Sequence, residues 1–123
     1  DIKLLCPQDF TIYSGDDSLT IPMMALGAHG VISVASHVAG IDIKNMIKYF
    51  KEGQNNKALE LHLKLYPIFK KLFMAPNPVP VKAALAHKGI IGEYVRKPLV
   101  ILDENEKRQL FEILDMYYSA SVI

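Results

Sequence analysis

Two short apolar runs near the start of the chain have the β-branched composition of strands, residues 11–13 and residues 31–34. Between them, apolar side chains recur at helical spacing at Leu19, Met23 and Leu26, which predicts a short helix. About sixteen residues separate the two runs, more than a hairpin uses and enough for a parallel crossover. The pattern therefore predicts a βαβ unit whose two strands are parallel.

Turn-forming residues follow the first of these strands. Gly15 allows a tight turn, and Asp16 or Asp17 can cap the helix that comes next. At the other end of that helix, Gly27 suits the left-handed position that follows a helix terminus. Because ligands of parallel α/β proteins bind at the carboxyl ends of strands, the candidate site lies at Gly15, Asp16, Ile32 and the residues just after them.

Two helices are predicted after the second strand. Asp42 is placed to cap the first of them, which ends at Gly53. The second runs over residues 56–73, and Pro67 should bend it. Apolar residues cover so much of this second helix that it should contact neighbours on more than one side. Its two candidate buried rows are Leu59, Leu63 and Tyr66, and Ala58, Leu61, Leu65, Ile68 and Leu72.

Alternating prolines over residues 76–80 predict a rigid corner, because each proline lacks an N–H donor and favours an extended residue before it. A helix over residues 81–87 should follow, closed by Gly89, and then an extended connection over residues 92–102. Asp103 and Glu106 have the spacing of a capping box at the start of the last helix. The residues that this helix should bury are Leu110, Ile113, Leu114 and Tyr117.

The length and composition suit one globular domain, with 123 residues of which 50% are hydrophobic. Two strands are nevertheless too few for an independent parallel sheet, which needs cover on both faces. The chain does not begin with Met, and residues 1–6 have the pattern of the last turn of a helix that began earlier. We therefore expect a fragment of a longer protein, or a protein whose first half is absent from this sequence.

Charge and hydropathy exclude several classes of protein. The net charge is +1 and the basic residues are scattered, which argues against nucleic-acid binding. No apolar run approaches the roughly 18 residues of a membrane span, and no leader-like segment begins the chain. Cys6 is the single cysteine, so an intramolecular disulfide is excluded. We expect a soluble, cytoplasmic protein.

Three blocks of the sequence closely resemble the dihydrodipicolinate synthase family of pyruvate-condensing aldolases. They are residues 13–18 with 27–34, residues 73–82, and residues 95–99, in the family's order. The resemblance implies an α/β fold, the carboxyl-terminal portion of a (β/α)8 TIM barrel with strands seven and eight, followed by a three-helix carboxyl-terminal domain. The last two β/α units of the barrel would occupy residues 1–53, and the helical domain residues 54–123.

The same resemblance implies an activity. The family condenses pyruvate with L-aspartate 4-semialdehyde in lysine and diaminopimelate biosynthesis, through a Schiff base on a lysine and without a metal or organic cofactor. That lysine lies on the sixth barrel strand, just before this segment, so no catalytic residue is expected in this chain. The expected partners are the missing amino-terminal half of the barrel and further copies of the protein, because full-length members commonly form homotetramers.

The resemblance also assigns substrate-binding roles. It implies that the backbone carbonyl of Ile32 contacts the pyruvate-derived ligand, whereas the bare sequence makes Ile32 a core residue. Gly15 and Asp16 would form an open wall whose carboxylate holds the amine of the second substrate, or they would make only a turn and a helix cap. For Asp17 we favour the structural role. Lys82 lies in a predicted helix rather than on a strand, so we expect a structural role for it as well.

Two other functions remain open at this point. One is another pyruvate aldolase of the same superfamily, similar to N-acetylneuraminate lyase, although residues 14–17 and 30–34 look much more like the synthase. The other is a non-catalytic half-barrel that acts as an interaction module by supplying strands to a partner. No metal site is expected, because the histidines are widely separated and have no i, i+4 pair. They are His29, His37, His62 and His87.

Overall fold

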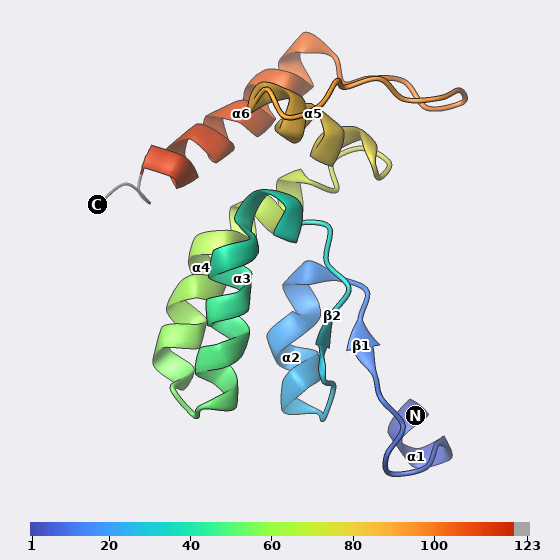
Figure 1. Ribbon diagram of the computed structural model, residues 1–123, viewed down its shortest axis with the longest axis vertical. Helices are drawn as coiled ribbons and strands as arrows, with labels where there is room; N and C mark the ends of the chain where they lie inside the picture. Colours follow the sequence, from blue (N-terminus) through green and yellow to red (C-terminus); the bar gives the residue numbers. More distant parts are fainter. Residues whose placement is uncertain (120–123) are drawn as a thin grey trace.

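The computed structural model of the chain describes residues 1–119. Strands and helices alternate in the first part of the chain, and helices alone follow (Figure 1). The elements in order are α1 (Ile2–Leu5), β1 (Tyr13–Ser14), the 3-10 helix η1 (Asp17–Leu19), α2 (Thr20–Ala25), β2 (Gly30–Val31), α3 (Ser36–Lys51), α4 (Asn55–Lys71), α5 (Val79–His87) and α6 (Glu104–Ser119). The predicted order of a β-α-β-α unit and three further helices is confirmed.

The two strands pair in parallel, as the crossover length predicted. Tyr13 lies opposite Gly30 and Ser14 opposite Val31. Beyond this register, the backbone N–H of Ile32 donates to the carbonyl of Ser14 at 2.9 Å. Each strand has only two residues, so the prediction of strand over residues 31–34 was wrong at its end. The chain leaves the sheet after Ile32, because the backbone N–H groups of Val34 and Ala35 donate to the side chain of Asp17 instead of to a strand.

The crossover between the strands is η1 followed by α2. Its buried residues include Thr20 and Met24, while Leu19 and Leu26, used to predict the helix, are exposed. Gly27 ends the helix with a φ of 93°, which confirms the left-handed position predicted for it. A side chain there would be strained by that φ, and a Cβ would lie 3.3 Å from Cε of Lys3.

The start of α3 differs from the prediction that Asp42 caps this helix. The helix begins at Ser36, with a break in helical geometry at Ala39, so Asp42 lies inside it. The Asp42 carboxylate instead accepts hydrogen bonds from Nζ of Lys64 at 3.0 Å and from the hydroxyl of Tyr117 at 3.1 Å. A short-range pattern could not show these partners, because they come from two later helices.

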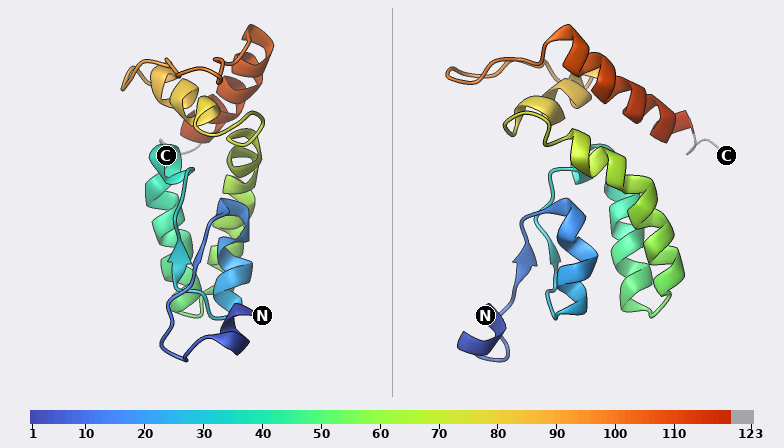
Figure 2. Two further views of the ribbon diagram at one scale, coloured as in Figure 1. Left: turned by 90° about the vertical axis from the view of Figure 1, so that its right-hand side faces the viewer. Right: turned by 180° about the vertical axis from the view of Figure 1, so that it is seen from behind.

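The helices α3 and α4 form an antiparallel hairpin, joined at Gly53, whose φ of 73° permits the turn (Figures 1 and 2). One of the two predicted rows of α4 is buried between its neighbours. Its fully buried members are Ala58, Leu65, Ile68 and Leu72. The other row, Leu59, Leu63 and Tyr66, is exposed, so only one side of α4 is covered by the described residues.

The last two helices lie across one end of this hairpin (Figures 1 and 2). The predicted capping box is confirmed: the N–H of Glu106 donates to Oδ1 of Asp103 at 2.8 Å, and the N–H of Asp103 to Oε2 of Glu106 at 2.9 Å. Leu110 and Leu114 are completely buried. Local sequence rules therefore hold well in this part of the chain.

A continuous apolar core joins α3, α4, α5 and α6, and Met46, Leu65 and Leu110 are among its members. It contains residues from both sides of Gly53, and the division into residues 1–53 and 54–123 stays a prediction. The end of the second unit, residues 120–123, lies outside the described residues. Among residues 1–119, no helix has both the length and the apolar character that a membrane crossing requires.

Candidate functional site

The carboxyl ends of β1 and β2 bring the three predicted site residues to one end of the sheet. Gly15 and Asp16 follow β1 directly, and Ile32 follows β2. The hydrogen bond from Ile32 N–H to the Ser14 carbonyl joins these two segments, because that carbonyl belongs to the peptide unit that leads into Gly15. The turn at Gly15 and Asp16 therefore lies beside Ile32, although Ile32 comes sixteen positions after Asp16 in the chain.

Gly15 leaves open space at this end of the sheet. Apart from Gly15 itself and its two chain neighbours, no heavy atom of the described residues lies within 4 Å of the place where a Cβ would stand. The turn around it is held by Ser14, whose hydroxyl donates to the carbonyl of Asp16 at 2.7 Å and accepts from the N–H of Asp16 at 3.1 Å. Since Ser14 is completely buried, it fixes the turn from the inside while Gly15 faces solvent.

Asp16 caps the helix η1 with one of its two carboxylate oxygens. Its Oδ1 accepts from the hydroxyl and the N–H of Ser18, at 2.6 and 2.7 Å, and from the N–H of Leu19 at 3.3 Å. The bond from the Ser18 hydroxyl is the main cause that lowers the pKa of Asp16 below its usual value, against partial burial, which raises the pKa. Asp16 is thus an exposed anion near neutral pH, and among residues 1–119 no donor binds its Oδ2.

Ile32 is not a core residue, as its side chain is 72% exposed. Successive side chains of a strand point to opposite faces, and Val31 packs against the core while Ile32 points away from it. Tyr13, on β1, is also half exposed, with its ring centroid 6.2 Å from that of His29. Within the part of the chain that the structure describes, the Ile32 carbonyl oxygen accepts no hydrogen bond.

Asp17 does not cap the helix that follows it, contrary to one of the two options that the sequence left open. Its carboxylate is buried and bonds to the segment after β2: Oδ1 accepts from the Ser33 hydroxyl, and Oδ2 from the N–H groups of Val34 at 3.1 Å and Ala35 at 3.0 Å. Sequence reasoning missed this link. The one signal in the sequence was that a second acidic residue, Asp17, directly follows Asp16, which can cap the helix by itself.

Lys82 lies on α5, as the sequence indicated, and its ammonium group donates a hydrogen bond to the backbone carbonyl of Tyr94. This contact ties α5 to the extended connection before α6. In the described residues, no group of three His, Cys, Asp or Glu side chains is arranged to hold a metal ion. At the strand ends, the carboxylate of Asp16 can accept hydrogen bonds, and the residues there include no lysine.

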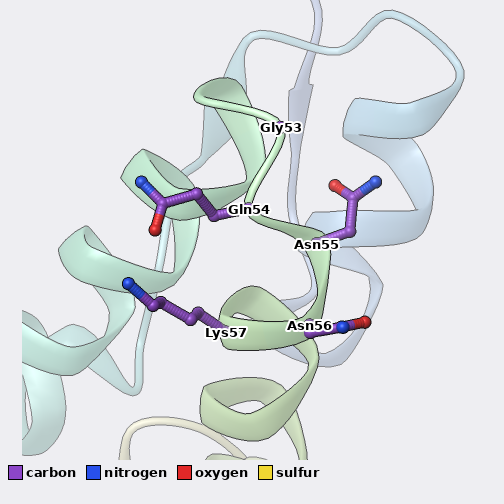
Figure 3. A pocket seen from close by; sticks show the side chains of 5 residues that line it. All are labelled: Gly53, Gln54, Asn55, Asn56 and Lys57. Atoms are coloured by element: carbon purple, nitrogen blue, oxygen red, sulfur yellow. The ribbon is translucent and has the colours of Figure 1, made fainter.

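A hollow lies at the turn between α3 and α4, with a volume of about 330 Å³. Figure 3 shows that its polar side chains diverge: Gln54 and Lys57 point to one side, and Asn55 and Asn56 away from them. The residues that line it are half-buried or exposed. Because these groups do not converge on one point, the strand ends remain the better candidate.

Comparison with known proteins gives a match over nearly the whole chain. Residues 1–117 match the model of the "Dihydrodipicolinate synthetase family". A 4-hydroxy-tetrahydrodipicolinate synthase from Bacillus velezensis is 51% identical over 108 residues. The alignment covers 88% of this chain but only 37% of that protein, so the chain spans little more than a third of the relative's length.

Solved structures agree with this match. The dihydrodipicolinate synthase from Aquifex aeolicus superposes with a TM-score of 0.91 at 42% identity, covering 95% of this chain and 40% of that one. The chloride-inhibited enzyme from Acinetobacter baumannii, solved with pyruvate, superposes with a TM-score of 0.84 at 32% identity, covering 89% of this chain and 38% of that one. The fold described above is thus similar to part of each of these proteins.

Proposed function

Because the chain belongs to the dihydrodipicolinate synthetase family, we propose that it forms the carboxyl-terminal part of a 4-hydroxy-tetrahydrodipicolinate synthase. The proposed reaction is the condensation of pyruvate with L-aspartate 4-semialdehyde. One observation carries this proposal: the family model matches residues 1–117, while the synthase from Bacillus velezensis is matched over 37% of its length. Because this relative is a 4-hydroxy-tetrahydrodipicolinate synthase, the similarity favours the condensation reaction over cleavage of N-acetylneuraminate by a lyase.

The incomplete sheet supports the proposal that β1 and β2 are the last two strands of a (β/α)8 barrel. A two-stranded parallel sheet leaves backbone donors and acceptors unpaired on both edges, and parallel sheets normally have both faces covered. The exposed side chains of Ile32 and Tyr13 lie on the face that the remaining barrel would enclose. The proposed division is a barrel part over residues 1–53 and a helical domain over residues 54–123.

In this proposal the strand ends contribute binding groups rather than the nucleophile. A lysine amine attacks the ketone of pyruvate, water leaves, and loss of a methyl proton gives an enamine that adds to the aldehyde of the second substrate. The amine of the adduct then attacks the imine carbon, which closes the ring and releases the lysine amine. Neither strand carries a lysine, and Lys82 bonds the Tyr94 carbonyl, so we place the reactive lysine outside this chain.

The free carbonyl of Ile32 is the group that we propose for pyruvate, and Gly15 and Asp16 for the semialdehyde. Two features support the second assignment. Asp16 uses Oδ1 for the helix cap, which leaves Oδ2 able to accept from a protonated amine. Its lowered pKa keeps the carboxylate ionised at neutral pH, and the open space at Gly15 gives a substrate access to it.

We also propose that the complete protein is a cytoplasmic homo-oligomer. The exposed apolar row of α4 (Leu59, Leu63 and Tyr66) supports association, because contiguous exposed apolar surface is typical of interfaces. The unpaired edges of β1 and β2 also support the alternative of a non-catalytic half-barrel. A measurement of condensation activity separates the synthase from the half-barrel.

The proposal is tested with a full-length chimera in which this chain replaces the matching segment of the Bacillus velezensis relative. We expect the chimera to condense pyruvate with L-aspartate 4-semialdehyde, whereas the relative truncated before that segment should be inactive. A folded chimera that binds no pyruvate would contradict the proposal and favour the half-barrel. Pyruvate release from N-acetylneuraminate, without condensation, would favour the lyase.

A further inference from the structure

The buried carboxylate of Asp17 connects the two ends of the βαβ unit. Asp17 is 2% exposed and begins η1, directly after the turn that follows β1. Its two oxygens together accept three hydrogen bonds, from the hydroxyl of Ser33 and from the N–H groups of Val34 and Ala35. All three donors lie in the segment between β2 and α3.

The network continues into the first residue of α3. The hydroxyl of Ser33, which donates to Asp17, also accepts from the N–H of Ser36 at 2.8 Å. Three successive backbone donors, at Val34, Ala35 and Ser36, are thus bound by Asp17 directly or through Ser33. A negative charge at this position also interacts favourably with the amino-terminal end of the helix dipole.

Ile32 lies between two anchors as a result. On one side its N–H donates to the carbonyl of Ser14 in β1. On the other side the next three residues are held by Asp17. Because the peptide unit that carries the Ile32 carbonyl lies between these bonds, its orientation depends on both of them.

We propose that Asp17 is a positioning residue of the site: it fixes the orientation of the Ile32 carbonyl toward the pyruvate-derived ligand. This inference rests on the proposed function. Asp17 is not required as a helix cap, since Asp16 already caps η1 with its Oδ1. The carboxylate of Asp17 instead bonds to residues sixteen to eighteen positions later.

The test uses steady-state kinetics of the chimera with Asp17→Asn, in which the shape is kept but the amide nitrogen faces a donor. Loss of the negative charge together with at least one of the three hydrogen bonds should raise the KM for pyruvate about tenfold. The KM for L-aspartate 4-semialdehyde should stay within about twofold, because Asp16 and Gly15 are held separately by Ser14. Ser33→Ala should raise the pyruvate KM less, since the two backbone bonds to Asp17 remain.

Asp42→Asn is the matched control, because the Asp42 carboxylate likewise accepts hydrogen bonds from other elements, but it ties α3 to α4 and α6. It should lower the thermal midpoint and leave both KM values unchanged. Equal changes in the two KM values of Asp17→Asn, or a loss of thermal stability with no change in the pyruvate KM, would overturn the inference. Absence of any pyruvate binding by the unmodified chimera would instead refute the proposed function.

Discussion

The backbone N–H of Ile32 donates to the carbonyl of Ser14 at 2.9 Å, one residue beyond the paired part of the two strands. This bond brings the turn at Gly15 beside the end of β2. The carboxyl ends of the two strands thus present the backbone carbonyl of Ile32, the open turn at Gly15 and the exposed carboxylate of Asp16 at one end of the sheet.

Asp16→Asn should affect the second substrate. If Oδ2 of Asp16 accepts from the amine of L-aspartate 4-semialdehyde, loss of the charge should raise the KM for that substrate about tenfold. Steady-state kinetics of the chimera check this, with Ser18→Ala as a control that removes one bond to Oδ1 and keeps the carboxylate. A larger effect on pyruvate than on the semialdehyde would contradict the assignment.

The pH dependence of stability should include a contribution from His62. Burial lowers the pKa of His62 below 6.5, and among residues 1–119 its buried Nδ1 has no hydrogen-bond partner. The neutral ring is therefore favoured in the folded state, so its contribution to stability is complete above pH 6.5 and decreases as the pH falls toward the folded pKa.

We expect His62→Phe to reduce the decline of the thermal midpoint as the pH falls below 6.5. His37→Gln is the control, because His37 is exposed. A decline that is as steep in His62→Phe as in the unmodified chimera would show that other groups cause it.

The two faces of α4 should differ strongly in their sensitivity to truncation. Leu65→Ala removes a completely buried side chain and should lower the free energy of unfolding by about 2–5 kcal/mol. Glu60→Ala, on an exposed residue of the opposite side of α4, should change it by less than about 0.5 kcal/mol. Denaturant unfolding of both variants checks the burial, and similar losses would contradict it.

The capping box of α6 should stabilise the start of that helix. Asp103→Ala leaves the N–H of Glu106 without its acceptor and should cost about 1 kcal/mol. Hydrogen exchange of the first amides of α6 measures the effect, with Glu104→Ala as the control, because the Glu104 side chain is 95% exposed. Unchanged exchange in Asp103→Ala would mean that the packing of Leu110 alone holds the helix end.

Features that depend on neighbouring residues could be predicted from the sequence. The reciprocal bonds of Asp103 and Glu106 follow from a three-residue spacing, and the positive φ of Gly27 from its place after a helix. The parallel pairing of the strands follows from the length of the crossover. In each case the interaction is local, or chain length limits the possible arrangements.

Features that depend on distant partners could not be predicted. The start of α3 was misplaced because Asp42 looks like a cap, and its true partners, Lys64 and Tyr117, come from later helices. The role of Asp17 was missed because its donors lie beyond the crossover. A buried position for Ile32 was wrong because the alternation of a strand shows two faces but does not say which one is covered.

The central claim is that the reactive lysine lies outside this chain, while the chain supplies the ends of two barrel strands. Reduction of the chimera with borohydride in the presence of labelled pyruvate, followed by peptide mapping, tests this claim most directly. We predict one labelled lysine, in the part contributed by the relative. Label on Lys82 or on any other lysine of residues 1–123 would contradict it.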